Sequence, residues 1–249
     1  MEVLLYSFLA GLATTLGAFI LFFTGQPSPK ILSGFLGFAG GIMLAISVFD
    51  LLPEALELGT IVSTVIGFLL GTAMMFVLDR FVPHAHGVTN NELELERTDN
   101  VPSFSSEALR TGYLIFFGIA IHNLPEGLAI GAGFEANPEL GLYIAVAIGL
   151  HNMPEGMAVA APLRSGGLLV SRVLLLTLIA GMMTPVGAGL GLLVFRVSPV
   201  FVGSGLAFAA GAMIYIVIDE IIPQMSNLHR HVGNAALIAG LLLGLVLGS

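Results

Sequence analysis

Two copies of one short motif carry the clearest chemistry in this sequence. Residues 122–127 and 151–156 both read His-Asn-x-Pro-Glu-Gly. In each copy the His and the Glu are four residues apart, so on a helix both side chains project from one face. Imidazole nitrogens and carboxylate oxygens together bind Zn²⁺, Fe²⁺, Mn²⁺ and similar ions. The motifs therefore predict a divalent metal site with the candidate ligands His122, Glu126, His151 and Glu155.

The residues beside these ligands fit the same interpretation. Asn123 and Asn152 point about 100° further round each helix than the histidines, where they could reach the same ion or a second one. Pro125 and Pro154 cannot donate to the carbonyl one turn earlier, which is left free next to the ligands. The simpler alternative is a hydrogen-bonded polar cluster that only joins two helices. The duplicated motif, with a negative charge in both copies, favours a metal site.

The composition indicates that lipid surrounds most of this chain. Of its 249 residues, 56% are hydrophobic and 10% are charged, whereas soluble proteins carry about 25% charged residues. Ionisable residues inside a membrane span are unfavourable and usually line a site or a pathway. The net charge of −8 argues against nucleic acid as a partner, and the absence of Cys excludes thiolate ligands.

Eight stretches are long and apolar enough to cross roughly 30 Å of hydrocarbon as helices. They cover residues 3–23, 31–52, 60–80, 111–132, 139–161, 170–194, 200–222 and 233–248. We therefore expect an all-α polytopic membrane protein that forms a single transmembrane domain over residues 1–249. The long connection at about 82–109 is polar, and His84 and His86 within it are candidate loop ligands for a metal ion.

An internal repeat relates the first and last thirds of the chain. Spans one and two recur in spans six and seven at a constant offset of 170 residues. The equivalent positions include Thr14 with Thr184 and Asp50 with Glu220 in these spans, and Gly67 with Gly240 in a weaker match of spans three and eight. The copies are five spans apart, an odd number, so the second enters the membrane from the opposite side. Such inverted repeats are common in transporters and predict a 3+2+3 arrangement.

Basic residues predict the orientation, because cytoplasmic loops are enriched in Lys and Arg. Of the eight basic residues, all except Arg196 fall on one side of the predicted spans. We therefore expect both termini to be extracytoplasmic and the long polar loop to be cytoplasmic, in a cell membrane (inner or plasma). Span two then ends outside with Asp50 and Glu54, and span seven ends inside with Asp219 and Glu220. These carboxylates are candidate pathway residues at opposite mouths.

Taken together, these features resemble the ZIP (Zrt/Irt-like) metal transporters. The paired motifs, the eight spans, the outside termini and the His-bearing loop between spans three and four are most similar to the short prokaryotic, GufA-like branch. The resemblance covers essentially the whole chain and implies import of Zn²⁺, Fe²⁺, Mn²⁺ or related ions into the cytoplasm. It also implies an elevator-like or rocking motion of spans one, four, five and six against the others. Homodimers occur in this family.

The resemblance further implies a second ion held by Asn123, Asn152 and the two motif glutamates. Many relatives supply an additional Glu from span six, where this chain has Thr184. Some relatives also have Asp in place of Asn152. With two negative ligands fewer, two adjacent dications would repel strongly. We therefore expect one well-bound ion per chain and a second position that is weak or empty.

Other classes of function compete with import. A metal-sensing or metal-stapled membrane protein would bind the ion without moving it, and an exporter would move it outward. An enzyme is not expected, because the His-Glu-x-x-His signature of zinc metalloproteases is absent. No prosthetic group is indicated, since the metal is the substrate. Mixed nitrogen and oxygen ligands do not choose among Zn²⁺, Fe²⁺, Mn²⁺, Co²⁺ and Cd²⁺.

Overall fold

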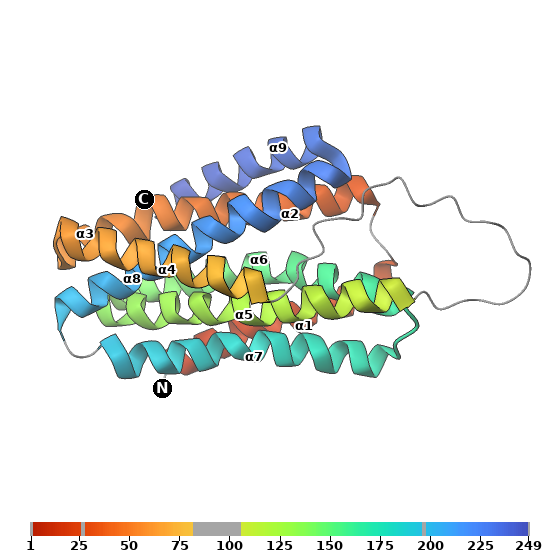
Figure 1. The fold of residues 1–249 in the computed structure, drawn as a ribbon, viewed down its shortest axis with the longest axis horizontal. Helices are drawn as coiled ribbons and strands as arrows, with labels where there is room; N and C mark the ends of the chain where they lie inside the picture. The colour runs from red at the N-terminus through yellow and green to blue at the C-terminus, as the bar shows by residue number, and fades with distance from the viewer. Residues whose placement is uncertain (1, 26–27, 82–105, 196–197, 249) are drawn as a thin grey trace, which may run out of the picture.

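The computed structural model describes residues 2–25, 28–81, 106–195 and 198–248, which form helices and short connections without a strand. The helices are α1 (Glu2–Thr24), α2 (Pro29–Ala45), α3 (Leu52–Leu58), α4 (Ile61–Phe81), α5 (Ser106–Ala136), α6 (Pro138–Ser165), α7 (Val170–Phe195), α8 (Pro199–Ile216) and α9 (Ile222–Gly248). Two π-helices, η1 (Ile46–Leu51) and η2 (Val217–Ile221), join α2 to α3 and α8 to α9. The long helices lie side by side along one axis (Figure 1).

Six helical stretches of the described residues are long and apolar enough to cross a membrane. They are Glu2–Phe23, Pro29–Leu58, Ile61–Leu78, Ala108–Ala136, Val170–Val194 and Pro199–Gly248. The last covers 50 residues, and non-helical backbone at His229 (φ −165°, ψ 87°) divides it. The prediction of an all-α polytopic membrane protein is confirmed. α5 begins at Ser106, so the last residues of the predicted 82–109 loop are helical, while His84 and His86 lie outside the described residues.

Three helices begin at the same local signal. Ser28, Asn137 and Ser198 each precede a proline, and each side chain accepts a hydrogen bond from a backbone N–H of the first helical turn. Such residues satisfy N–H groups that lack a partner at a helix start, and proline suits the first helical position because it has no N–H to leave unpaired. These caps therefore define the starts of α2, α6 and α8.

Packing divides the helices into two groups. α1, α5, α6 and α7 pack against one another, and we call these four helices the site group. α2 packs against α9, α4 against α8 and α3 against α8; with η1 and η2, these helices form the flanking group. The two groups meet mainly where α5 contacts α8 and where α2 contacts α6.

Glycines allow the closest helix contacts inside the site group. Gly11 on α1 and Gly181 on α7 lie against each other's carbonyl group, and a Cβ atom on either would collide with it. Gly127 lies in the same way against the carbonyl of Thr184, and Gly156 against that of Thr14. Small residues at such crossings let helix backbones approach closely in a membrane. The glycine of each motif therefore fixes α5 against α7 and α6 against α1.

Matching contacts in the flanking group revise one part of the predicted repeat. Gly71 lies against the carbonyl of Phe208, and Gly240 lies against the carbonyl of Phe38. Since Phe38 and Phe208 are equivalent in the sequence repeat, these contacts make Gly71 the equivalent of Gly240. The sequence pattern equates Gly67 with Gly240 and is wrong by one helical turn, because apolar helices rich in Gly and Leu offer several similar alignments.

Candidate metal site

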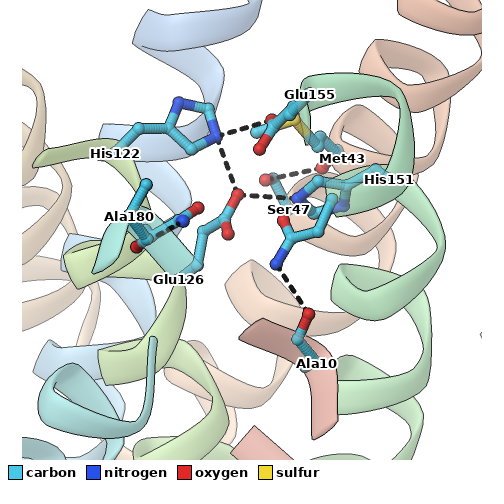
Figure 2. Close-up of polar contacts among 10 residues, drawn as sticks. Ala10, Met43, Ser47, His122, Glu126, His151, Glu155 and Ala180 are labelled. Carbon is cyan, nitrogen blue, oxygen red and sulfur yellow. Dashed lines mark hydrogen bonds and ion pairs between the residues drawn. The ribbon is translucent and has the colours of Figure 1, made fainter. Parts of the chain in front are cut away.

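The two motifs meet in the interior of the bundle, where α5 faces α6. Glu126 Oε1 lies 2.8 Å from His122 Nε2 and 2.6 Å from His151 Nε2, and Glu155 Oε1 lies 3.1 Å from His122 Nε2. Figure 2 shows the four side chains pointing toward one another, with Glu126 between the two histidines. One ligand atom from each residue lies within 4.8 Å of all the others. Four ligands of one ion, each about 2 Å from it, lie at most about 4 Å apart, so a contraction of roughly 1 Å would let all four bind one ion.

This cluster is buried, and two of its carboxylate oxygens have no hydrogen-bond partner. His122 is 2% exposed, Glu155 is 4% exposed, and Glu126 and His151 are fully buried. The second carboxylate oxygens, Glu126 Oε2 and Glu155 Oε2, have no hydrogen-bond partner. Buried polar atoms are normally paired, and exceptions need an explanation such as an ion or a water. Two carboxylates and two imidazoles that converge in the buried interior suit a divalent cation.

The two asparagines hold the motif helices to their neighbours. Asn123 Nδ2 donates to the Ala180 carbonyl on α7 at 2.9 Å, and Asn152 Nδ2 donates to the Ala10 carbonyl on α1 at 3.0 Å. Both side chains are fully buried, and both Oδ1 atoms lack a hydrogen-bond partner. Each asparagine therefore holds its helix in place through the amide nitrogen, and its amide oxygen is left free to bind a metal ion.

Two threonines extend the set of free buried oxygens. Thr14 and Thr184 are fully buried, and neither hydroxyl has a hydrogen-bond partner. Thr184 lies one helical turn after Ala180, whose carbonyl accepts the hydrogen bond from Asn123. Thr14 lies one turn after Ala10, whose carbonyl accepts the hydrogen bond from Asn152. Thr184 is a candidate from the sequence, but Thr14 is not. The sequence signal that could have identified Thr14 as a candidate is its equivalence to Thr184 in the repeat.

The flanking group also reaches this site. Met43 at the end of α2 and Ser47 in η1 are fully buried and lie beside the cluster in Figure 2. The Ser47 hydroxyl donates to the Met43 carbonyl at 2.8 Å. Sequence analysis does not single out either residue, because small polar and thioether side chains are common in apolar helices. α2 also packs against α6, the helix that carries His151 and Glu155.

The predicted mouth residues Asp50 and Glu54 lie together in a cavity of about 370 Å³, which we call the vestibule. It is lined by Phe49, Asp50, Pro53, Glu54, Glu57, Asn137, Glu139, Leu140, Tyr143, Leu247 and Gly248. Glu57 and Glu139 add two carboxylates that sequence analysis misses, because they come from exposed positions of separate helices. None of the four cluster ligands lines this cavity, so vestibule and cluster are distinct.

Asp219 and Glu220 belong to η2 and are partly buried. The η1–α3 segment and the junction of α8 with α9 lie toward opposite ends of the bundle (Figure 1). The structure therefore separates the two predicted pairs of mouth carboxylates along the length of the helices, and it brings neither pair into the cluster.

Comparisons with known proteins identify the class to which this chain belongs. The family model described as ZIP Zinc transporter matches residues 89–248. The chain is 38% identical over 225 residues to proteins named "Zinc transporter ZupT" from Salmonella typhimurium (strain LT2) and Salmonella newport (strain SL254), an alignment covering 88% of this chain and 85% of each relative. The chain therefore belongs to the ZIP zinc transporter family. It is a membrane transporter of divalent metal ions and not an enzyme.

Proposed function

We propose that this protein imports a divalent transition-metal ion into the cytoplasm through a site formed by α5 and α6. The observation that carries the proposal is the meeting of two buried histidines and two buried glutamates within 4.8 Å. The relatives are named as zinc transporters, so Zn²⁺ is the first substrate to test. Fe²⁺, Mn²⁺, Co²⁺ and Cd²⁺ follow, because the same nitrogen and oxygen ligands accept all of them.

The proposed ligands of the transported ion are His122, Glu126, His151 and Glu155. The free oxygens of Asn123 and Asn152 are proposed as further ligands, either of this ion or of a second one beside it. The oxygens available at that second position, including Thr184, are largely neutral, so it holds a second dication weakly or not at all. One tightly bound ion per chain is the expected stoichiometry.

We propose eight spans in a 3+2+3 arrangement, with both termini extracytoplasmic. The packing supports an inverted repeat, because contacts occur in equivalent pairs: α1 with α6 and α7 with α5, then α2 with α9 and α8 with α4. The two hydrogen bonds from Asn123 and Asn152 form another such pair. Both chain ends lie toward one end of the bundle in Figure 1, which an even number of spans requires.

The proposed transport motion moves the site group against the flanking group. All four cluster ligands belong to the site group, and their asparagine neighbours bond within it, so the site travels as a unit. Asp50 and Glu54 would then form part of the outer path, and Asp219 and Glu220 part of the inner path. A homodimer, implied by the family resemblance, is tested by measuring the mass of the purified protein.

Metal uptake by purified protein in liposomes tests the proposal. The unaltered protein should take up Zn²⁺, and a Glu126→Ala, Glu155→Ala double variant should not. Glu2→Ala is a matched control, because it removes an exposed carboxylate at the start of α1. Tight Zn²⁺ binding without Zn²⁺ uptake would instead indicate a metal-sensing or metal-stapled membrane protein. Loading metal inside instead of outside, with protein of known orientation, distinguishes import from export.

A further inference from the structure

Thr14 and Thr184 differ from two other buried hydroxyls in their hydrogen bonding. The hydroxyl of Thr177 bonds to a carbonyl one turn earlier on α7, and that of Ser47 bonds to one at the end of α2. This back-bonding is a common arrangement of Ser and Thr side chains inside helices. Thr14 and Thr184 are equally buried within α1 and α7, yet neither hydroxyl has a hydrogen-bond partner. Both hydroxyls are therefore left to bind a ligand.

The asparagines of the two motifs account for this difference. Asn123 donates to the carbonyl one turn before Thr184, and Asn152 donates to the carbonyl one turn before Thr14. A carbonyl oxygen has two lone pairs, and a backbone N–H of the helix uses the first, so the amide leaves none for the hydroxyl. The amide oxygens of both asparagines also lack a partner. We call these four fully buried atoms the neutral oxygens: Thr14 Oγ1, Thr184 Oγ1, Asn123 Oδ1 and Asn152 Oδ1.

The neutral oxygens surround the crossing of α1 and α7. Gly11 and Gly181 lie against each other at this crossing, and Thr14 Oγ1 is 3.4 Å from the position that a Cβ on Gly181 would take. On each of the two helices, the residue directly before the crossing glycine accepts the hydrogen bond from a motif asparagine. The threonine follows three positions after that glycine. All four neutral oxygens therefore belong to the surroundings of one helix crossing.

This crossing also reaches the His/Glu cluster. The glycine that follows each cluster glutamate lies against the carbonyl of one of these threonines. Gly127 contacts the Thr184 carbonyl in this way, and Gly156 contacts the Thr14 carbonyl. The second carboxylate oxygen of each glutamate has no hydrogen-bond partner either. The neutral oxygens are therefore one helix contact away from two buried carboxylates.

Neutral oxygen ligands are typical of sites for monovalent cations, since carbonyl oxygens coordinate Na⁺ and K⁺ in transporters and channels. A monovalent cation is also repelled by the transported dication only half as strongly as a second dication at the same distance. We propose that the neutral oxygens bind Na⁺, which stays beside Glu126 and Glu155 after the transported ion has left. Buried carboxylates need such compensation, so Na⁺ would be the counter-ion while the site group returns without metal. This inference rests on the proposed metal site and transport motion.

Thermal unfolding tests the Na⁺ site without any transported metal. The purified protein, stripped of metal with EDTA, is unfolded in NaCl and, at equal ionic strength, in N-methyl-D-glucamine chloride, whose cation is too large for the site. The unfolding midpoint should be higher in NaCl by about 2–4 °C, because a ligand that binds only the folded state stabilises it. The Thr14→Val, Thr184→Val double variant should lose this difference, because valine keeps the branched shape and removes both hydroxyl oxygens.

The matched control is Thr177→Val, which removes a buried hydroxyl that already bonds within its own helix and should keep the difference between the salts. Equal midpoints of the unaltered protein in both salts overturn the proposal, since water alone then satisfies the neutral oxygens. A difference that persists in the double variant also overturns it. If the double variant does not fold, Thr14→Val alone is compared with Thr14→Ser. The serine keeps a hydroxyl and should keep the larger difference, and equal differences overturn the proposal.

Zn²⁺ titration measures the link between the Na⁺ site and the metal site. Because the two cations repel each other, replacing N-methyl-D-glucamine with Na⁺ should weaken Zn²⁺ affinity by about fivefold or more, the lower end of typical coupling between sites. Unchanged or tighter Zn²⁺ binding in Na⁺ would overturn the counter-ion role. The unfolding measurement needs neither Zn²⁺ nor flux, so the Na⁺ site can fail while liposome uptake still supports transport, and the reverse.

Discussion

The two helix groups differ in what they bury. In the described residues, the fully or almost fully buried ionisable side chains, His122, Glu126, His151 and Glu155, all belong to the site group. The flanking group buries mainly apolar residues and a few hydroxyls, such as Ser33 and Thr64. Both groups nevertheless use the same packing device, a glycine pressed against a carbonyl of the neighbouring helix.

This difference assigns separate tasks to the two groups. Both groups share this close packing, but the His/Glu cluster belongs to only one of them. Glu126 and Glu155 can remain buried because histidines of the same group lie beside them, and an ion would add to this compensation. The flanking group carries the carboxylates of η1 and η2, which lie toward the two ends of the bundle. Under the proposed motion, the site group would carry the ion past the flanking group, as alternating access requires.

The largest expected effect is a loss of Zn²⁺ affinity that differs between the two glutamates of the cluster. Glu126 contacts both histidines, whereas Glu155 contacts only His122, and at a longer distance. We expect Glu126→Gln to weaken Zn²⁺ affinity by about 100-fold or more, since even altered outer-shell partners cost about 10–100-fold. Glu155→Gln should have a smaller effect. Calorimetric titration of the purified variants measures both, and equal losses would contradict the central position of Glu126.

A double substitution should change the number of metal ions bound per chain. Asn152→Asp combined with Thr184→Glu adds two carboxylates beside the cluster, in place of the neutral amide and hydroxyl oxygens of Asn152 and Thr184. The bound metal should rise from one ion per chain toward two, because the added charge offsets repulsion between adjacent dications. Elemental analysis of metal and sulfur gives the ratio. A ratio of two in the unaltered protein would refute the expectation of one ion, and a ratio of one in the variant would refute its electrostatic explanation.

A pair of glycine substitutions compares the groups directly. Gly156→Ala and Gly71→Ala each place a Cβ against a backbone carbonyl, in the site group and the flanking group respectively. Both should destabilise the protein by about 1–3 kcal/mol, the usual effect of overpacking. Only Gly156→Ala should also weaken metal binding, because Gly156 directly follows the proposed ligand Glu155. Thermal unfolding and Zn²⁺ titration measure the two effects, and weakened binding in Gly71→Ala would show that the groups are not separate.

The smallest expected effect lies in the flanking group. The single proton of the Ser33 hydroxyl is shared between the carbonyls of Met225 and His229, whose oxygens lie 2.8 and 2.9 Å from Ser33 Oγ near the break in α9. Ser33→Ala should lower stability by about 0.6 kcal/mol and by at most about 1.7 kcal/mol, the range measured for hydrogen bonds in membrane helices. Zn²⁺ affinity should not change. Thermal unfolding checks the first statement and titration the second, with a change in affinity counting against the division into two groups.

Much of the fold and of the site could be predicted from the sequence. Long apolar stretches gave the helices, because a lipid solvent permits few other structures for the backbone. The spacing of His122 and Glu126, repeated in His151 and Glu155, predicted the four residues that meet in the cluster, because the α-helix fixes which side chains share a face. The constant offset of 170 residues, seen for example between Thr14 and Thr184, related the first spans of the chain to the last ones. These inferences depend on local geometry or on order along the chain, both of which can be read from the sequence.

The remainder was decided by contacts between helices distant in sequence. Neither the vestibule, which joins Glu57 on α3 with Glu139 on α6, nor the reach of Tyr143 to Gly244 follows from any local pattern. The sequence also misplaced the equivalent of Gly240, because many registers of two Gly- and Leu-rich helices look alike. The sequence alone therefore determined which residues could bind metal. Only the tertiary structure decided which oxygens stay free, since this depends on which carbonyls neighbouring helices present to Asn123 and Asn152.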